Sequence, residues 1–360
     1  MKTRYFFFLG LICSLILSSC HQAGKYAFDD IKYVTSFDAE LRISPQSRTK
    51  EDLGIDGIKG FKIYGPYIIV SSESEEGMIT ILEKVAPYRK LGSFFKKGNG
   101  PGELLYPFLP SSFNYHTAED GSIYAEIDNR AGKLIRFDIT RSLQEGRTIT
   151  EVIGETKNTT FSAIDLGEEG VFYKALSTER DAQTRYIVKG EQRIITKGME
   201  KLNSARIKNK VDDGTRYNVL SGGVYYDPES KQFFETPGEI NAFHVYSLDD
   251  TIAKTFCLGD KLYDYNEIAD RDAADRPMTS ICTRLYDYYL AILYLDIPAR
   301  NYYLEDWSPA LILYYWDTGG IVKAYLPDKV NCFDMDEETL SIYAFDSESE
   351  SFYVYDVSGM

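Results

Sequence analysis

The chain has 360 residues, and 55 acidic side chains against 40 lysines and arginines give it a formal net charge of −15. A protein this acidic is not expected to present the basic face that binds nucleic-acid phosphates or anionic lipids. We therefore expect neither nucleic acid nor an anionic lipid surface as an electrostatic partner. Aromatic residues make up 14% of the chain, 29 of them tyrosines, and such segments suit half-buried strands. Composition therefore favours an all-β protein.

The first 20 residues resemble the signal of a bacterial lipoprotein. Lys2 and Arg4 precede an apolar run over residues 5–17, and the run ends in Leu-Ser-Ser-Cys20. An aliphatic residue, two small residues and a cysteine, in this order, resemble a lipobox. The alternative is a membrane-spanning anchor, but the run is shorter than the roughly 20 apolar residues that a spanning helix needs.

The resemblance implies how the chain is processed and where it goes. Residues 1–19 would be removed as a signal peptide, and Cys20 would receive a diacylglycerol and become the new N-terminus. His21 stands where an aspartate would favour retention in the inner membrane. We therefore expect an envelope protein with a lipid anchor in the outer membrane; whether it faces the periplasm or the cell surface stays open.

Beyond residues 20–30, which we interpret as a tether, short apolar or aromatic runs alternate with turns rich in Gly, Asp, Asn and Ser, as in β-proteins. Several of the runs end in an aromatic residue followed by aspartate, as at Asp138, Asp317 and Asp356. In chain order, the paired runs cover 61–70 with 78–82, 121–127 with 133–138, 170–175 with 184–188, 223–226 and 232–234 with 242–247, 288–294 with 310–317, and 340–345 with 351–356.

This sixfold recurrence, at intervals of roughly 40–60 residues, is typical of propeller blades, which bury their faces by stacking around an axis. We predict an all-β fold: one six-bladed β-propeller of four-stranded antiparallel blades over residues 31–360. The last repeat, residues 330–356, has room for only three strands, so we expect the segment Ile31–Ile43 to supply the fourth and close the ring. Two β-sandwich domains are the alternative, but they would not explain the repetition.

An early glycine-rich segment, Gly98-Asn-Gly-Pro-Gly-Glu103, carries a second resemblance. Uncharacterised six-bladed propeller lipoproteins of the TolB-like and NHL-like type often contain Gly-x-Gly-Pro-Gly-Glu in an early blade. The resemblance implies fold and location and supplies no catalytic residues. A phosphate-binding loop would need GxxxxGK[ST], and Glu103 would repel phosphate, so we interpret the segment as a tight connection between blades.

The sequence offers no convincing catalytic set. No GxSxG motif is present, and His116 and His244 are more typical of structural histidines. The best carboxylate groups, Glu126-Ile-Asp-Asn129 and Asp334-Met-Asp-Glu-Glu338, suit hairpin turns. We therefore predict no catalytic residue, no metal ligand and no cofactor. The alternative is a metal-dependent hydrolase or lyase with Ca²⁺ or another divalent cation held by carboxylates in the central channel.

Two further features bear on binding and on redox chemistry. Trp307 lies in a polar context, Glu-Asp-Trp-Ser-Pro, so we expect it to be exposed and able to stack on a ligand. Cys257, Cys282 and Cys332 remain after the signal and the anchor; one disulfide or three buried thiols are both open. The sequence favours a non-enzymatic binding or scaffold protein of the envelope, whose partner is an envelope protein, a peptide or a glycan.

Overall fold

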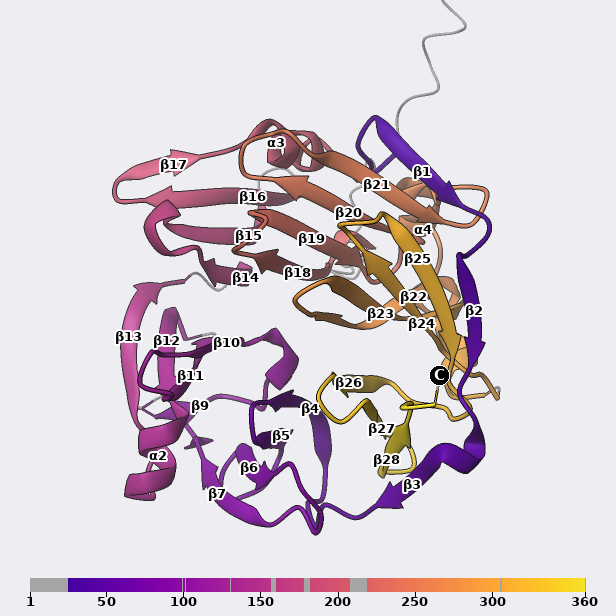
Figure 1. Ribbon diagram of the computed structural model, residues 1–360. Helices are drawn as coiled ribbons and strands as arrows, with labels where there is room; N and C mark the ends of the chain where they lie inside the picture. Colours follow the sequence, from indigo (N-terminus) through magenta and orange to yellow (C-terminus); the bar gives the residue numbers. More distant parts are fainter. Residues whose placement is uncertain are drawn as a thin grey trace, which may run out of the picture.

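A computed structural model describes residues 25–98, 100, 102–129, 131–156, 160–177, 182–207, 219–304 and 306–359. Six mainly antiparallel sheets follow one another around a ring (Figure 1), which confirms the predicted six-bladed propeller. Cys20 lies outside the described residues. Within those residues, no helix is long and apolar enough to cross a membrane.

The first three blades each have four strands, taken in order from the axis outwards. Blade 1 comprises β4 (Ile58–Tyr64), β5 (Tyr67–Ser72), β6 (Ile79–Glu83) and β7 (Lys90–Phe94). Blade 2 comprises β10 (Asn114–Thr117), β11 (Ile123–Asp128), β12 (Lys133–Asp138) and β13 (Thr150–Glu155). Blade 3 comprises β14 (Thr160–Asp165), β15 (Val171–Ser177), β16 (Ala182–Lys189) and β17 (Gln192–Ile194).

The last three blades take a strand each from the N-terminal segment. Blade 4 comprises β18 (Gly222–Asp227), β19 (Gln232–Pro237), β20 (Ala242–Ser247), β21 (Ala253–Leu258) and β1 (Asp30–Val34). Blade 5 comprises β22 (Pro277–Leu285), β23 (Tyr289–Pro298), β24 (Ala310–Tyr315), β25 (Gly320–Tyr325) and β2 (Ala39–Arg42). Blade 6 comprises β26 (Cys332–Asp336), β27 (Ser341–Asp346), β28 (Ser351–Asp356) and β3 (Arg48–Glu51).

Short elements connect the blades. They are β8 (Lys96–Lys97) and β9 (Glu103–Leu104), the helices α2 (Ile139–Glu145), α3 (Lys197–Asn203) and α4 (Tyr265–Ala269), and the 3-10 turns η1 (Pro45–Ser47), η2 (Pro110–Ser112), η3 (Gly167–Glu169), η5 (Ala273–Asp275) and η6 (Ala299–Tyr302).

Burial explains why the sequence predicts the middle strands of the blades. Every residue of β20 is buried, and so is all of β5 except its first residue, because neighbouring blades cover both faces of a middle strand. The outermost strand of blade 2, β13, has no buried residue. A strand in the middle of a blade therefore appears as a near-continuous apolar run, whereas an outer strand is largely polar.

The hydrophobic core is divided among the seams between blades. Five clusters of buried side chains lie between blades 1 and 2, 3 and 4, 4 and 5, 5 and 6, and 6 and 1. None of these clusters, drawn from the part of the chain that is described, joins blades 2 and 3. That seam instead includes a hydrogen bond from the Tyr173 hydroxyl to the Glu155 carbonyl oxygen, at 3.1 Å.

The ring is closed by an N-terminal strand as predicted, but the strand is β3 and not the segment Ile31–Ile43. β3 pairs antiparallel with β28, while β1 and β2 run parallel to β21 and β25 as fifth strands at the outer edges of blades 4 and 5 (Figure 1). The alternation in 31–43 does mark strands, but an edge of another blade receives them. The closing strand is Arg-Thr-Lys-Glu, whose outer position requires no apolar pattern.

Part of the expected tether belongs to the folded body. Tyr26, Ala27 and Phe28 are buried at the seam between blades 3 and 4, and the Phe28 amide donates to the Thr255 hydroxyl at 2.9 Å. The N-terminal segment therefore contacts blades 4, 5 and 6 in succession before the chain enters blade 1.

The glycine-rich segment lies between blades 1 and 2, where we placed a tight connection. The Glu103 carboxylate turns back and accepts a hydrogen bond from the Gly100 amide at 2.7 Å. A Cβ on Gly98 would lie 2.0 Å from the same carboxylate oxygen, so any larger residue there would displace the Glu103 side chain. Gly102 has a φ of +77°, which only glycine adopts readily. The glutamate is therefore an internal cap of the loop.

Candidate functional site

The innermost strands of the six blades surround a central channel. Because these strands run in the same direction along the axis, one mouth collects their first residues and the other their last. We call these the strand-start mouth and the strand-end mouth. Tyr225 of β18 lines the hollows at both mouths and a smaller one between them.

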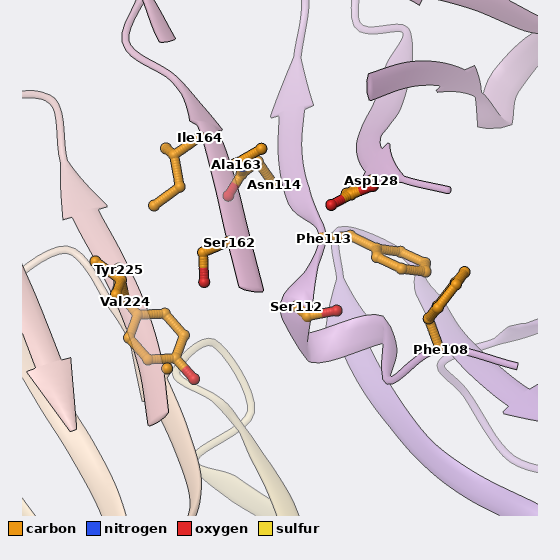
Figure 2. A pocket seen from close by; sticks show the side chains of 11 residues that line it. Phe108, Ser112, Phe113, Asn114, Asp128, Ser162, Ala163, Ile164, Val224 and Tyr225 are labelled. Atoms are coloured by element: carbon orange, nitrogen blue, oxygen red, sulfur yellow. The ribbon is translucent and has the colours of Figure 1, made fainter. Parts of the chain in front are cut away.

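The small hollow lies at the seam between blades 2 and 3, beside blade 4, and has a volume of about 100 Å³. Figure 2 shows Ser162 and Tyr225 on one side of it and Ser112, Phe113 and Asp128 on the other. It is too small for an organic ligand but large enough for water.

The strand-start mouth holds a cavity of about 610 Å³, within the range of about 300–1,000 Å³ usual for small-molecule sites. Apolar atoms form most of the surface of its wall, and the polar groups include one lysine, one carboxyl group and several hydroxyls. The lining residues are Lys59, Leu109, Ser112, Ser221, Gly222, Gly223, Tyr225, Thr236, Gly238, Glu239, Met278, Ser280, Ile281, Cys282, Thr283, Tyr302, Asn331 and Cys332.

A rigid loop presents the carboxyl group of this wall. The loop follows β19, and the Thr279 hydroxyl of β22 lies 2.9 Å from the Gly238 carbonyl oxygen and 3.0 Å from that of Ile240. The Gly238 amide donates to the Ser221 carbonyl at 2.8 Å. Blades 4 and 5 therefore hold the backbone on both sides of Glu239, so the point from which its side chain extends is set before any ligand arrives.

The Glu239 carboxyl has an unsatisfied buried oxygen and a raised pKa. Its Oε2 atom is buried and has no hydrogen-bond partner within the described chain. Burial raises the pKa of this carboxyl to about 7, against the opposing effect of the Arg276 guanidinium. Near neutral pH the group can therefore either donate or accept a hydrogen bond.

The strand-end mouth is smaller, about 470 Å³, and is organised around a buried carboxylate. Asp334 of β26 accepts hydrogen bonds from the Tyr286 hydroxyl at 2.7 Å and the Ile63 amide at 2.6 Å. Lys62 lies 3.1 Å from it, and the Arg284 Nε atom 3.6 Å. Burial lowers the pKa of Lys62 against the attraction of Asp334. This cluster ties blades 1, 5 and 6 together, with the one carboxylate facing two cations.

The carboxylates considered as cation ligands do not converge on the channel. Glu126 lies 3.1 Å from Arg136 and 3.6 Å from His116; burial alone would raise its pKa, but these two neighbours lower it. Asp128 accepts from the Thr156 hydroxyl, and the Asn129 side chain caps its own turn.

Three carboxylates of the second acidic segment are paired with cations. Asp334 belongs to the cluster above, Asp336 pairs with Lys84 at 2.9 Å, and the largely exposed Glu338 lies 3.6 Å from the same lysine. Across the described ranges, no group of three His, Cys, Asp or Glu side chains could hold a metal ion.

The two histidines lie on different blades. His116 stacks on Tyr124 and borders the strand-end mouth. His244 is fully buried at the seam between blades 3 and 4, with its Nδ1 3.1 Å from the Thr255 hydroxyl. Burial lowers the pKa of His244 to about 3, so it is neutral and structural at physiological pH.

Trp307 is not exposed as we expected; only 8% of it is accessible. Its indole N–H donates to the Tyr302 carbonyl oxygen at 2.8 Å, its ring packs against the Tyr302 ring, and the Lys329 ammonium lies over both rings. A polar stretch can bury its one aromatic residue beneath a lysine side chain. The exposed large apolar side chains of this loop, within its described part, are Tyr303 and Leu304. A stacking role for Trp307 would require this packing to open.

Sequence reasoning missed Glu239 and Arg284. Glu239 follows a Pro-Gly pair, where a glutamate is ordinarily solvated, so no local signal sets it apart. Arg284 lies in the run Ser-Ile-Cys-Thr-Arg-Leu285, and a lone arginine among such residues is the one hint of a buried charge.

No protein-family profile matches the sequence, and no curated protein is similar enough to count as a relative. Among solved structures, a candidate exported protein of Bacteroides fragilis has a TM-score of 0.49 and 11% identity, covering 90% of this chain and 99% of that one. The calcium-binding protein regucalcin of Agrobacterium tumefaciens has a TM-score of 0.41 and 10% identity, and the match covers 88% of this chain and 95% of that one. An auxiliary nutrient-binding protein of Bacteroides ovatus has a TM-score of 0.44 and 8% identity, and the match covers 83% of this chain and 69% of that one. At such identities the likeness concerns the fold alone.

Proposed function

We propose that this protein is an exported, lipid-anchored binding protein of the cell envelope, and that its ligand site is the strand-start mouth. The cavity of about 610 Å³, with its pre-positioned and unpaired Glu239, is the observation that carries the proposal. Export and anchoring rest on the lipobox resemblance at Cys20, and the TolB-like and NHL-like resemblance at residues 98–103 agrees with it.

The chemistry of the wall favours a small ligand with both apolar and polar parts, such as a short glycan or the end of a peptide. The Glu239 carboxyl and the Ser280 hydroxyl offer hydrogen bonds, and two tyrosines, Met278 and Ile281 supply apolar surface. Scattered polar groups of this kind select a ligand by hydrogen bonding. The hydrolase or lyase alternative needs converging carboxylates, which this wall does not supply.

The binding test is a thermal-shift screen of the mature chain, residues 20–360, against panels of oligosaccharides and short peptides. A ligand that raises Tm should lose its effect in Ser280→Trp, which fills the cavity, and keep it in Ser358→Trp, a matched change at an exposed position. Equal shifts in both variants would place the site elsewhere.

Metal analysis and melting with and without EDTA test the alternative. One tightly held cation, together with a fall in Tm on chelation, would favour the metal-dependent enzyme. Fatty-acid labelling of cells tests the anchor, and label should be lost in Cys20→Ser and kept in Cys257→Ser.

A further inference from the structure

Two thiols from different blades meet in the wall of the strand-start cavity. Cys282 lies within β22 of blade 5, and Cys332 is the first residue of β26 of blade 6. Their Sγ atoms are 3.9 Å apart, and neither is in a disulfide. Both residues line the cavity, so a small reagent in the channel can reach them.

Positive charge lies against one of these sulfurs. The Arg284 Nη2 atom is 3.3 Å from Cys332 Sγ, and the guanidinium is fixed by hydrogen bonds to the carbonyl oxygens of Thr283 and Phe61. The hydrogen bond from the Cys282 thiol, together with Arg284, lowers the pKa of Cys332 despite its burial. The same hydrogen bond raises the pKa of Cys282. The contact therefore favours the thiolate at Cys332 and the protonated thiol at Cys282.

We propose that Cys282 and Cys332 are a redox pair that closes to a disulfide and joins blades 5 and 6 at the cavity wall. The sulfurs must approach by about 2 Å to reach bonding distance, which is within the range of side-chain rotation. This inference stands on the contact between the two thiols and does not depend on what the cavity binds.

The chemistry balances with a diazene such as diamide as the oxidant. The Cys332 thiolate adds to one nitrogen of the N=N bond, and the other nitrogen takes up a proton. The Cys282 thiol then loses its proton, its sulfur attacks the Cys332 sulfur, and the S–N bond breaks. Two thiols have lost two hydrogens to form one S–S bond, and the diazene has become a hydrazine.

The third cysteine serves as an internal control. Cys257 is buried in blade 4, with its sulfur 3.7 Å from the Asn241 side-chain nitrogen. Burial raises its pKa to about 11. It should therefore stay reduced in the folded protein under conditions that oxidise the pair.

The experiment treats the folded mature chain with diamide, blocks free thiols with N-ethylmaleimide in denaturant, and maps proteolytic peptides without reduction. We expect one intramolecular cross-link between the peptides containing Cys282 and Cys332, with Cys257 alkylated. Cys257→Ser should retain the cross-link, whereas Cys282→Ser and Cys332→Ser should lose it. In Cys257→Ser, the oxidised form should also melt at a higher temperature than the reduced form.

Three results would overturn the proposal, and all three come from wild-type protein, so they do not depend on how the variants fold. In one, both thiols are alkylated after diamide treatment. In another, the recovered cross-links involve Cys257 or join Cys282 or Cys332 of two chains. In the third, iodoacetamide labels Cys332 of the folded, reduced protein no faster than it labels Cys257, which would contradict the activation of Cys332.

Discussion

The charged network between blades 3 and 4 allows a sharp test of how this propeller is held together. Glu235 of β19 accepts hydrogen bonds from Arg185 at 2.8 and 2.5 Å, from Lys174 at 2.9 Å and from the Tyr26 hydroxyl at 2.5 Å. All four side chains are buried, and the three charged ones have no accessible surface. One carboxylate therefore compensates two buried cations, and we expect Glu235→Gln to be strongly destabilising.

The magnitude follows from what each cation can do when the carboxylate is neutralised. Arg185 cannot release its proton, and leaving one member of a buried pair uncompensated costs about 3–5 kcal/mol. Burial already lowers the pKa of Lys174 to about 8, so releasing its proton at pH 7 adds only roughly 1 kcal/mol. The side-chain carbonyl oxygen of the introduced glutamine can retain one bond from the guanidinium. We expect the free energy of unfolding to fall by about 4 kcal/mol.

The assay is equilibrium unfolding in urea at pH 7, followed by circular dichroism. Glu169→Gln is the matched control, because Glu169 joins the same two blades through Lys189 and Lys231, both at 3.3 Å, but at the surface. Such exposed pairs contribute about 0–1 kcal/mol. If Glu235→Gln costs no more than Glu169→Gln, the reasoning about uncompensated buried charge is wrong.

Four further changes have defined outcomes. Between pH 8 and 10, the wild-type protein should gain stability relative to Lys174→Met. The reason is that the pKa of Lys174 is about 8 in the folded protein and roughly 10.4 in the unfolded chain, so folding releases a proton in this range. Urea unfolding curves of both proteins at the two pH values measure the gain. From pH 4.5 to 7, the wild-type protein should lose stability relative to Glu239→Gln, because folding raises the pKa of Glu239 to about 7 and the folded protein binds a proton in this range. A constant difference in Tm between the two proteins over that range would contradict this. Glu103→Ala frees the Gly100 amide and should cost about 1 kcal/mol in urea unfolding. Gly98→Ala should be less damaging in the Glu103→Ala background than alone, because the clash with the carboxylate is removed.

The repeat was predictable because the middle strands of a propeller blade are buried on both faces. Phe243 and Val245 of β20 and Ile68 of β5 contact neighbouring blades, so selection for apolar residues leaves a run at each repeat. The closing strand Arg48–Glu51 was not predictable in this way, since it pairs through its backbone and leaves its side chains at the surface.

The channel was not predictable because its wall is assembled from residues far apart in the chain. Cys282 and Cys332 are 50 positions apart, and only the stacking of blades 5 and 6 brings their sulfurs together. Glu239 resembles any glutamate in a turn until Thr279 and Ser221 hold its loop over the cavity. Such contacts depend on how the blades are rotated about the axis, which no local pattern encodes.

The burial of Tyr26 changes what a lipid on Cys20 would mean for the orientation of the disc. The tether first expected over residues 20–30 is reduced to the few residues before Tyr26, whose ring packs at the seam between blades 3 and 4. Six residues from Cys20 to Tyr26 reach at most about 20 Å when extended. With the anchor in place, the rim at blades 3 and 4 would stay close to the bilayer. Because this tether would hold the disc at one seam only, it would limit the distance of that seam from the bilayer and leave the channel axis free to turn.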